Sequence, residues 1–499
     1  MDAQSTSARI RSALRRSFAA GVAALSLAAC AVPDVDTSIE RVAPAADGKL
    51  EIHGASGPLS AEQSAAVLAK AGASHAADDA AGDGSLAAHL AIEQAVAGDP
   101  LVAENAVQVL RNGADTFRAM SAVMRAARHS INLEYYTIEN VILDDNLSLL
   151  DLLVAKRQEG VAVNIVYDAY GSSDTPAEFW DRLKAAGVNL LPFHPLSDVF
   201  NLNNRDHRKI LVADGETAIL GGVNLSHSYE SKAPGSSSRE EREEHESLAD
   251  RAAREARLGG ATALTENLPD YWLDTAVRIE GPVVAQAQAL FRDHWKFEKG
   301  PPLDEAGFFP PLGSRGHEVV RIIGSTPEQD ISRYYVTVVS AMRNAKTRIW
   351  LSAAYFVPTP AEKDALIAAA RRGVDVRLLL PGESDSEKAL RAGETHYLDL
   401  LQGGVRIWQA HGVVLHSKCV VIDSVWSAIG SSNFDHRSVL FNDEVDAVIL
   451  GTETAGELEQ VLRNGAKYGT ELDAKTWAED RPAGERVRGF FTRFVEHQL

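Results

Sequence analysis

The sequence predicts an α/β protein built as a duplicated α/β/α sandwich, with two pseudo-twofold related halves and an active site at their interface. Apolar runs typical of strands alternate with helical runs, which indicates a largely parallel or mixed sheet covered by helices on both faces. A set of landmarks also recurs in the second half of the chain at a nearly constant offset. Two of these landmarks are copies of a His-x-Lys-x4-Asp motif.

The repeat can be followed from landmark to landmark. Each copy opens with an apolar strand and a helical run. Gly160 and Gly373, which precede the next strand of each copy, lie 213 residues apart. His207 and His416, which begin the two motifs, lie 209 residues apart. Such agreement over several landmarks indicates that one structural unit was duplicated.

These landmarks divide the chain into segments. We expect a first half over residues 101–300 and a second half over residues 315–499. The first half contains a charged insert, residues 231–267, which has the composition of a solvated helix or loop. Residues 30–100 are rich in Ala, Asp, Gly and Ser, and are predicted to form a tether. Within the tether two stretches have helical character, residues 61–71 and 87–97.

Composition and charge limit the possible partners. The chain has 499 residues, of which 45% are hydrophobic and 24% are charged, as is typical of a soluble globular protein. It has 50 Lys and Arg against 69 Asp and Glu, so its formal net charge is −19. An acidic surface repels polyanions. Nucleic acid is therefore not expected as a partner, although a local basic site remains compatible with this balance.

The first residues have the pattern of an export signal. Several arginines precede an apolar run over residues 18–29, and together they indicate a signal peptide over residues 1–29. The run is shorter than the roughly 20 apolar residues that cross a bilayer. It ends in Leu-Ala-Ala followed by Cys30, which resembles the lipobox of bacterial lipoproteins.

The lipobox resemblance implies that Cys30 is lipidated and becomes the first residue of the mature chain. The lipid would hold the protein at a membrane surface in the cell envelope, facing the periplasm. Ala31 in place of aspartate implies sorting to the outer membrane. An ordinary signal peptide with an incidental cysteine is the alternative.

Each motif copy reads as a strand, on which alternate side chains share a face. The histidine and lysine of one copy therefore point the same way. A glycine-containing turn begins seven residues after each motif aspartate and ends in asparagine. The candidate catalytic residues are His207, Lys209 and Asp214 in the first copy and His416, Lys418 and Asp423 in the second, and the candidate phosphate-binding residues are Asn224 and Asn433.

This set of side chains suits the chemistry of a phosphodiester. A neutral imidazole can attack phosphorus and form a covalent intermediate. A second, protonated imidazole can donate to the departing oxygen and then accept a proton from the incoming alcohol or water. Lysine and asparagine side chains can hold the non-bridging oxygens. No metal or other cofactor is expected. Two surface strands with incidental histidines are the alternative interpretation.

The paired motifs resemble those of the phospholipase D superfamily, and more narrowly those of its bacterial cardiolipin synthase branch. The resemblance covers about residues 110–499 and implies the phospholipase D-type sandwich. It implies that His207 is the nucleophile and that His416 is the general acid and base. Two acids on corresponding strands, Asp274 and Glu444, are implied to orient the histidines. The motif aspartates are expected to support the fold around the site rather than to touch substrate.

The leading hypothesis is a membrane-anchored phosphatidyltransferase that forms a phosphatidyl-histidine from a phospholipid such as phosphatidylglycerol and passes it to a lipid alcohol. If water accepts the group, the same site is a phospholipase D. A nuclease-type phosphodiesterase and a non-catalytic lipid-binding protein are further alternatives. We expect the protein to be a monomer. Typical synthases of the branch often begin with transmembrane helices, and this lipoprotein-like start departs from that pattern.

Overall fold

The computed structural model describes most of the chain beyond the expected signal peptide. The predicted signal peptide, Cys30 and the charged insert lie outside the described residues. The described residues are 34–46, 50–72, 86–144, 146–195, 203–230, 271–327 and 332–480, with a few single positions between these ranges.

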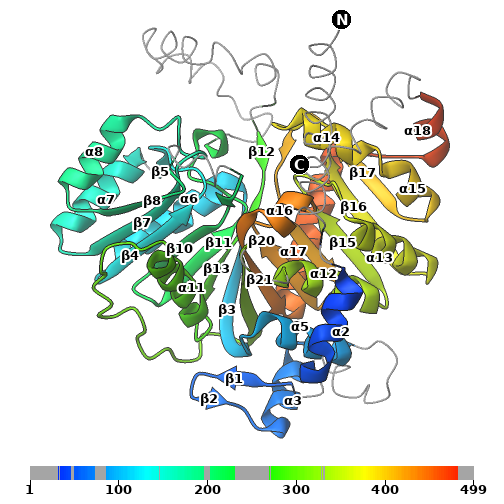
Figure 1. Ribbon diagram of the computed structural model, residues 1–499, viewed down its shortest axis with the longest axis horizontal. Coiled ribbons are helices and arrows are strands. Elements are labelled where there is room, and N and C mark those ends of the chain that lie inside the picture. Colours follow the sequence, from blue (N-terminus) through cyan, green and yellow to red (C-terminus); the bar gives the residue numbers. More distant parts are fainter. Residues whose placement is uncertain are drawn as a thin grey trace, which may run out of the picture.

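One continuous sheet runs through both halves, and the order of its strands repeats from each outer edge to the middle (Figure 1). In each half three strands on the outer side of the motif strand are parallel, and the strands from the motif inward are antiparallel. The second half adds β22 (Gly469–Glu471), which pairs antiparallel at its outer edge. The first half contributes β8 (Asn189–Phe193), β7 (Ala162–Asp168), β4 (Ser130–Tyr135), β10 (Lys209–Ala213), β11 (Thr217–Gly221), β13 (Thr275–Glu280) and β3 (Leu101–Arg111). The second half contributes β17 (Arg406–Ala410), β16 (Asp375–Pro381), β15 (Arg348–Ser352), β19 (Cys419–Ile422), β20 (Trp426–Gly430), β21 (Asn442–Leu450) and β14 (Glu318–Ser325).

The two halves meet where β3 and β14 pair antiparallel. Helices cover both faces of the sheet, so the fold is the expected duplicated α/β/α sandwich. One face carries α6 (Asn112–Ala126), α7 (Leu149–Gln158) and α8 (Ala177–Ala185) in the first half, and α12 (Arg333–Asn344), α13 (Pro360–Arg371) and α15 (Tyr397–Gln402) in the second. The opposite face carries α11 (Val284–Phe297) and α17 (Thr452–Gly465).

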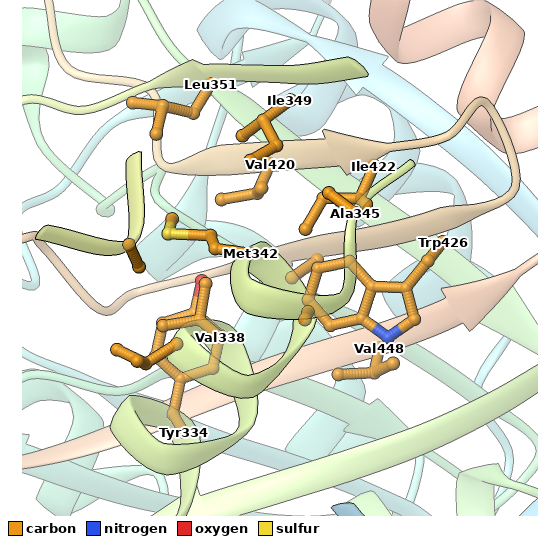
Figure 2. Close-up of a cluster of buried hydrophobic side chains, with 14 of the residues drawn as sticks. Tyr334, Val338, Met342, Ala345, Ile349, Leu351, Val420, Ile422, Trp426 and Val448 are labelled. Carbon is orange, nitrogen blue, oxygen red and sulfur yellow. The ribbon is translucent and has the colours of Figure 1, made fainter. Parts of the chain in front are cut away.

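Helix α12 shows how the sandwich is held together. Figure 2 shows its side chains Val338 and Met342 pointing toward Ile349 of β15, Val420 of β19 and Trp426 of β20. All five are buried. Along these strands, side chains that face α12 alternate with side chains that face α17. Both sets are buried and apolar, so the strand sequences are continuous apolar runs. Burial of this kind is the main favourable contribution to folding.

The segment predicted as a tether differs from that expectation over its described parts. It forms α2 (Val35–Ala46), β1 (Ile52–Gly54), β2 (Gly57–Pro58), α3 (Ala61–Lys70) and α5 (Leu86–Ala97). Strand β1 pairs parallel with β3, and the apolar side chains of these elements join the core cluster around α12. The helical stretches were expected, but their packing against the catalytic domain was not. Alanine-rich helices show little apolar periodicity in sequence, and yet their small side chains allow close packing on a neighbouring helix.

A buried ion pair fixes α5 to the sheet. Glu93 of α5 accepts a hydrogen bond from Arg321 of β14 at 2.8 Å, and both side chains are fully buried. The indole nitrogen of Trp426 donates to the same carboxylate at 3.2 Å. Burial acts to raise the pKa of Glu93, but Arg321, His89 and the Trp426 indole together outweigh it and the pKa is lowered. The carboxylate is therefore ionised and needs its partners.

The motif aspartates bind backbone N–H groups of the neighbouring strand at the far end of each motif strand. Asp214 accepts hydrogen bonds from the backbone N–H groups of Arg128, His129 and Ser130, at the start of β4, at 2.7–2.8 Å. Asp423 holds the start of β15 in the same way through residues 346–348. Each aspartate follows its histidine by seven positions, which corresponds to about 23 Å of extended chain.

Among the described residues, no helix combines the length and the apolar character needed to cross a bilayer.

Replacing Glu93 by glutamine tests whether α5 belongs to the folded unit. The change leaves Arg321 buried without its countercharge, so we expect the free energy of unfolding to fall by about 3 kcal/mol. Denaturant unfolding measures this. The matched control is Glu62→Gln on the exposed surface of α3. Equal unfolding curves for the two variants would contradict the packed arrangement.

Replacing Asp214 by asparagine tests its contacts with the start of β4. One acceptor oxygen and its charge are lost beside three N–H donors, so we expect a loss of about 1–3 kcal/mol in unfolding free energy. Thermal and denaturant unfolding are compared with those of Asp181→Asn, a change at an exposed aspartate of α8. A loss no larger than that of the control would show that these contacts contribute little to stability.

Candidate active site

The two motif histidines lie where segments from opposite halves pair. β9 (Arg205–Asp206) leads into His207 and pairs with the start of β21, and the His207 N–H donates to the Asp443 carbonyl at 2.9 Å. In the other half β18 (Val414–Leu415) leads into His416 and pairs with β12 (Trp272–Leu273). The His416 N–H donates to the Leu273 carbonyl at 2.8 Å. Each histidine is thus built into the edge of the opposite half.

His207 is held by Glu444. Its Nδ1 lies 3.0 and 3.1 Å from the two carboxylate oxygens, and Glu444 is fully buried on β21. Ser438 and Asn442 donate to the same carboxylate at 2.8 and 3.1 Å, which fixes its position. A carboxylate at Nδ1 favours the tautomer that carries a proton there. Nε2 is then the basic nitrogen.

His416 is held in the same way by Asp274, whose Oδ2 lies 2.8 Å from Nδ1. The hydroxyl of Tyr229 and the ammonium of Lys418 also lie 2.8 Å from this nitrogen. A ring nitrogen makes one in-plane hydrogen bond, and we assign it to Asp274 because that contact repeats the one at His207. Tyr229 and Trp272 pack against the ring.

The supporting acids therefore cross between the halves. Glu444 of the second half holds the histidine of the first half, and Asp274 of the first half holds the histidine of the second. The sequence predicted that the two acids orient the histidines, but it did not indicate which acid contacts which ring. The exchange follows from the β9–β21 and β12–β18 pairings, which place each acid beside the opposite motif.

The two motif lysines occupy equivalent places. Each Nζ donates to the carbonyl of the histidine two residues earlier at 2.6 Å, so histidine and lysine share a face as expected. Burial lowers the pKa of Lys209 to about 7 and lowers the pKa of Lys418 as well. Burial also lowers the pKa of His207 to about 4, although Glu444 opposes the shift, and it lowers the pKa of His416. Both imidazoles are therefore neutral in the empty site near neutral pH.

The two turn asparagines lie on either side of this centre. The side-chain oxygen of Asn224 accepts from the Thr137 N–H at 3.2 Å, and that of Asn433 accepts from the Tyr355 N–H at 3.4 Å. Engagement of the oxygen leaves the amide NH2 group as the donor to a ligand. The motif aspartates, in contrast, lie away from this centre: Asp214 and Asp423 bind backbone N–H groups at the far ends of the motif strands, in the position that a supporting role requires.

A pocket of about 440 Å³ opens beside His207. It is lined by residues of both halves, so it straddles their interface. Several of these residues were not singled out from the sequence as site residues, because a single aromatic or arginine side chain carries no motif signal. The lining residues are Tyr136, Tyr170, Asn203, Arg205, His207, Tyr355, Asn433, Asp435, Arg437 and Asn442.

Arg208, the middle residue of the first motif, points to the opposite face of β10 and joins the halves. Its guanidinium donates to Glu134 of β4 at 3.1 Å and to Asp443 of β21 at 3.0 Å. His294 of α11 also contacts Glu134, at 2.9 Å. These contacts are buried. They tie the segment that carries His207 to both β4 and β21, and therefore hold the histidine.

Possible metal ligands within the described ranges were also considered. Glu134, Asp206 and His294 bring ligand atoms within 4.8 Å of one another, as do His317, Glu318 and Glu453 on the surface. In the buried group burial acts to lower the pKa of His294, but the charge and hydrogen bond of Glu134, together with the charge of Asp443, outweigh it and raise the pKa to about 9. A protonated imidazole is no metal ligand. With Arg208 alongside, the buried group has the character of an ion-pair network.

Comparison with known proteins identifies the family. The sequence matches the family described as cardiolipin synthase, PLD-like domain, over residues 120–233 and 338–464. It is 30% identical to a probable cardiolipin synthase of Bacillus subtilis, over 79% of this chain and 72% of that protein. It is 31% identical to cardiolipin synthase A of Pseudomonas syringae, over 77% of this chain and 73% of that protein.

A solved structure agrees with the fold. Phosphatidylserine synthase of Haemophilus influenzae superposes with a TM-score of 0.57, covering 82% of this chain and 99% of that chain at 12% identity. The matches in sequence include both motif copies, and the structural match spans both halves. The chain is therefore an enzyme of the phospholipase D superfamily and belongs to its cardiolipin synthase-like branch.

Proposed function

We propose that this enzyme transfers a phosphatidyl group from a phospholipid such as phosphatidylglycerol to a lipid alcohol, through a covalent intermediate on His207. The observation that carries the proposal is the pair of buried imidazoles, each held by a carboxylate from the other half, beside two lysines. Relatives named cardiolipin synthases support the choice of a phospholipid substrate.

In the first step Nε2 of His207 attacks phosphorus with its lone pair, and the bond from phosphorus to the headgroup oxygen breaks. Glu444 accepts from Nδ1 and stabilises the positive charge that the ring acquires. His416 donates a proton to the leaving oxygen, so the headgroup departs as a neutral alcohol. An entering phosphate anion raises the pKa of His416, and Asp274 stabilises the proton on that ring.

In the second step the acceptor hydroxyl gives its proton to His416 and attacks phosphorus. The bond between phosphorus and His207 breaks, and the free histidine is restored. Lys209, Lys418 and the NH2 groups of Asn224 and Asn433 hold the non-bridging oxygens in both steps. These groups are buried, where charge interactions are stronger than in water.

We also propose that a lipid on Cys30 holds the enzyme at a membrane of the cell envelope, on the periplasmic side. The lipobox-like sequence before this cysteine supports the anchor. Membrane attachment suits an enzyme whose donor and acceptor both lie in a bilayer.

Products formed from phosphatidylglycerol vesicles test the reaction. We expect cardiolipin and glycerol, and we expect His416→Ala to lower the rate about 10²- to 10⁴-fold because the proton donor is lost. His207→Ala removes the nucleophile and should abolish turnover. The matched control is His317→Ala, a change at an exposed histidine. Phosphatidic acid formed without cardiolipin would identify a hydrolase instead.

The pH dependence of kcat/KM tests the charge states. His207 must be neutral to attack, so activity should fall as pH drops through its pKa of about 4. Lys209 must be charged to bind phosphate, so activity should fall as pH rises through its pKa of about 7. Lys209→Arg keeps the charge at high pH, so the upper limb should become shallower and retain only the loss of the proton that His416 donates. An upper limb that is unchanged in this variant would assign it to another group.

A further inference from the structure

The residue five positions after each turn asparagine supports the acid of its own half. In the second half this residue is Ser438 of α16 (His436–Leu440), and its hydroxyl donates to Glu444 at 2.8 Å. In the first half it is Tyr229, the last residue of a short 3-10 helix, and its hydroxyl hydrogen-bonds the Asp274 carboxylate. The duplication thus supplies a hydroxyl to both supporting acids, from a serine in one half and a tyrosine in the other.

Tyr229 makes a second contact, with the imidazole of His416 itself. Its hydroxyl oxygen lies 2.8 Å from Nδ1, and its ring packs edge-on against the imidazole with the centroids 6.0 Å apart. Asp274 lies 2.8 Å from the same nitrogen. Because Nδ1 gives its proton to Asp274, the phenol proton goes to that carboxylate as well. The hydroxyl therefore braces the acid and the ring against each other.

The Tyr229 hydroxyl keeps its proton near neutral pH. The side chain is buried, with 2% of the residue exposed. Burial, together with the charges of Asp274 and Asp385, raises the pKa of Tyr229 well above its usual range. A phenol in this state is a lasting donor to a carboxylate, and a hydrogen bond to a charged group is among the stronger ones.

The backbone and ring of Tyr229 are fixed by contacts that do not involve the hydroxyl. The Tyr229 carbonyl packs so closely on α6 that a Cβ at Gly113 would lie 1.9 Å from the carbonyl oxygen. The Tyr229 N–H donates to the Ser226 carbonyl at 3.0 Å, and the ring packs against Trp272 with the centroids 5.2 Å apart. Phenylalanine at this position would therefore keep the packing and lose the hydroxyl.

Proton donation depends on where Nε2 of His416 points, because proton transfer requires the acid to lie within hydrogen-bonding reach of the leaving oxygen. Nδ1 and its partners set that direction. We propose that Tyr229 is a positioning residue for the proton donor, and that its hydroxyl holds Asp274 and the His416 ring in the alignment in which Nε2 faces the leaving oxygen. The inference rests on the proposed function, which assigns proton donation to His416, and it adds a residue that neither motif contains.

This role can be separated from a structural one by the choice of leaving group. When His207 attacks phosphorus, the electron pair of the broken bond stays on the leaving oxygen. A glycerol oxygen is strongly basic and needs the proton that His416 gives up. A p-nitrophenol oxygen is weakly basic and departs as the anion without that proton. A loss that acts through His416 therefore slows the release of glycerol, whereas a general disturbance of the site slows both releases.

The experiment measures the first step with two donors that differ in the leaving group. Phosphatidylglycerol labelled in its headgroup and phosphatidyl-p-nitrophenol are presented in the same detergent micelles, with the full-length enzyme in excess, so that each release reports a single turnover. We expect Tyr229→Phe to slow the release of glycerol about tenfold or more, as for a lost hydrogen bond to a charged group, and to change the release of p-nitrophenol less than about twofold. His416→Ala should show the same selectivity more strongly.

The matched control is Tyr335→Phe, which removes another buried phenol hydroxyl. Tyr335 lies on α12, and its hydroxyl is 3.0 Å from that of Thr359. This variant should leave both releases unchanged. Thermal unfolding of the two variants shows whether each keeps its fold, so that a change in rate is compared between folded enzymes.

Each other outcome also decides the question. Equal slowing of both releases in Tyr229→Phe would show that the hydroxyl only supports the structure, and unchanged releases would show that it does not act on His416. Either result would overturn the inference while a selective loss in His416→Ala left the proposed mechanism in place. If His416→Ala itself slowed both releases equally, His416 would not be the proton donor, and that part of the proposed function would fail together with the inference.

Discussion

The crossing of two carboxylates between the halves is the contact on which the rest of the site depends. Glu444 reaches the His207 ring and Asp274 reaches the His416 ring, each from the opposite copy of the duplicated unit. The orientation of either imidazole is therefore a property of the interface and not of one half. The β9–β21 and β12–β18 pairings and the buried Arg208 network all hold that interface in one register. A shift between the halves would separate both histidines from their acids together.

The same burial that orients the site also sets its charges. Four ionisable side chains, two histidines and two lysines, are withdrawn from water within a small volume, and each has a lowered pKa. Such a cluster is costly without an anion. An entering phosphate diester adds negative charge beside these groups, so it favours their protonated forms and raises their pKa values.

Much of the fold and the centre of the site could be predicted from the sequence. The duplicated motif, read as a strand, correctly placed each histidine and lysine on one face, and the landmark offset indicated the repeated sheet. The motif aspartates were harder, because sequence spacing gives distance along a strand but not the hydrogen bonds at its end. The packing of α5 depends on one buried Glu93–Arg321 pair between residues far apart in sequence. Tyr229 likewise reaches the site only through tertiary contacts.

The packed N-terminal segment has a consequence for how the enzyme meets a membrane. A lipid on Cys30 would be followed by four residues before Val35, which is buried at the start of α2. The distance from Cys30 to Val35 is therefore at most about 18 Å when this stretch is fully extended. The lipid attachment would then keep the catalytic domain close to the bilayer surface. The short connection would also restrict the orientations that the domain can adopt relative to that surface. Donor and acceptor lipids would then reach the active-site pocket mainly by their own lateral diffusion in the membrane.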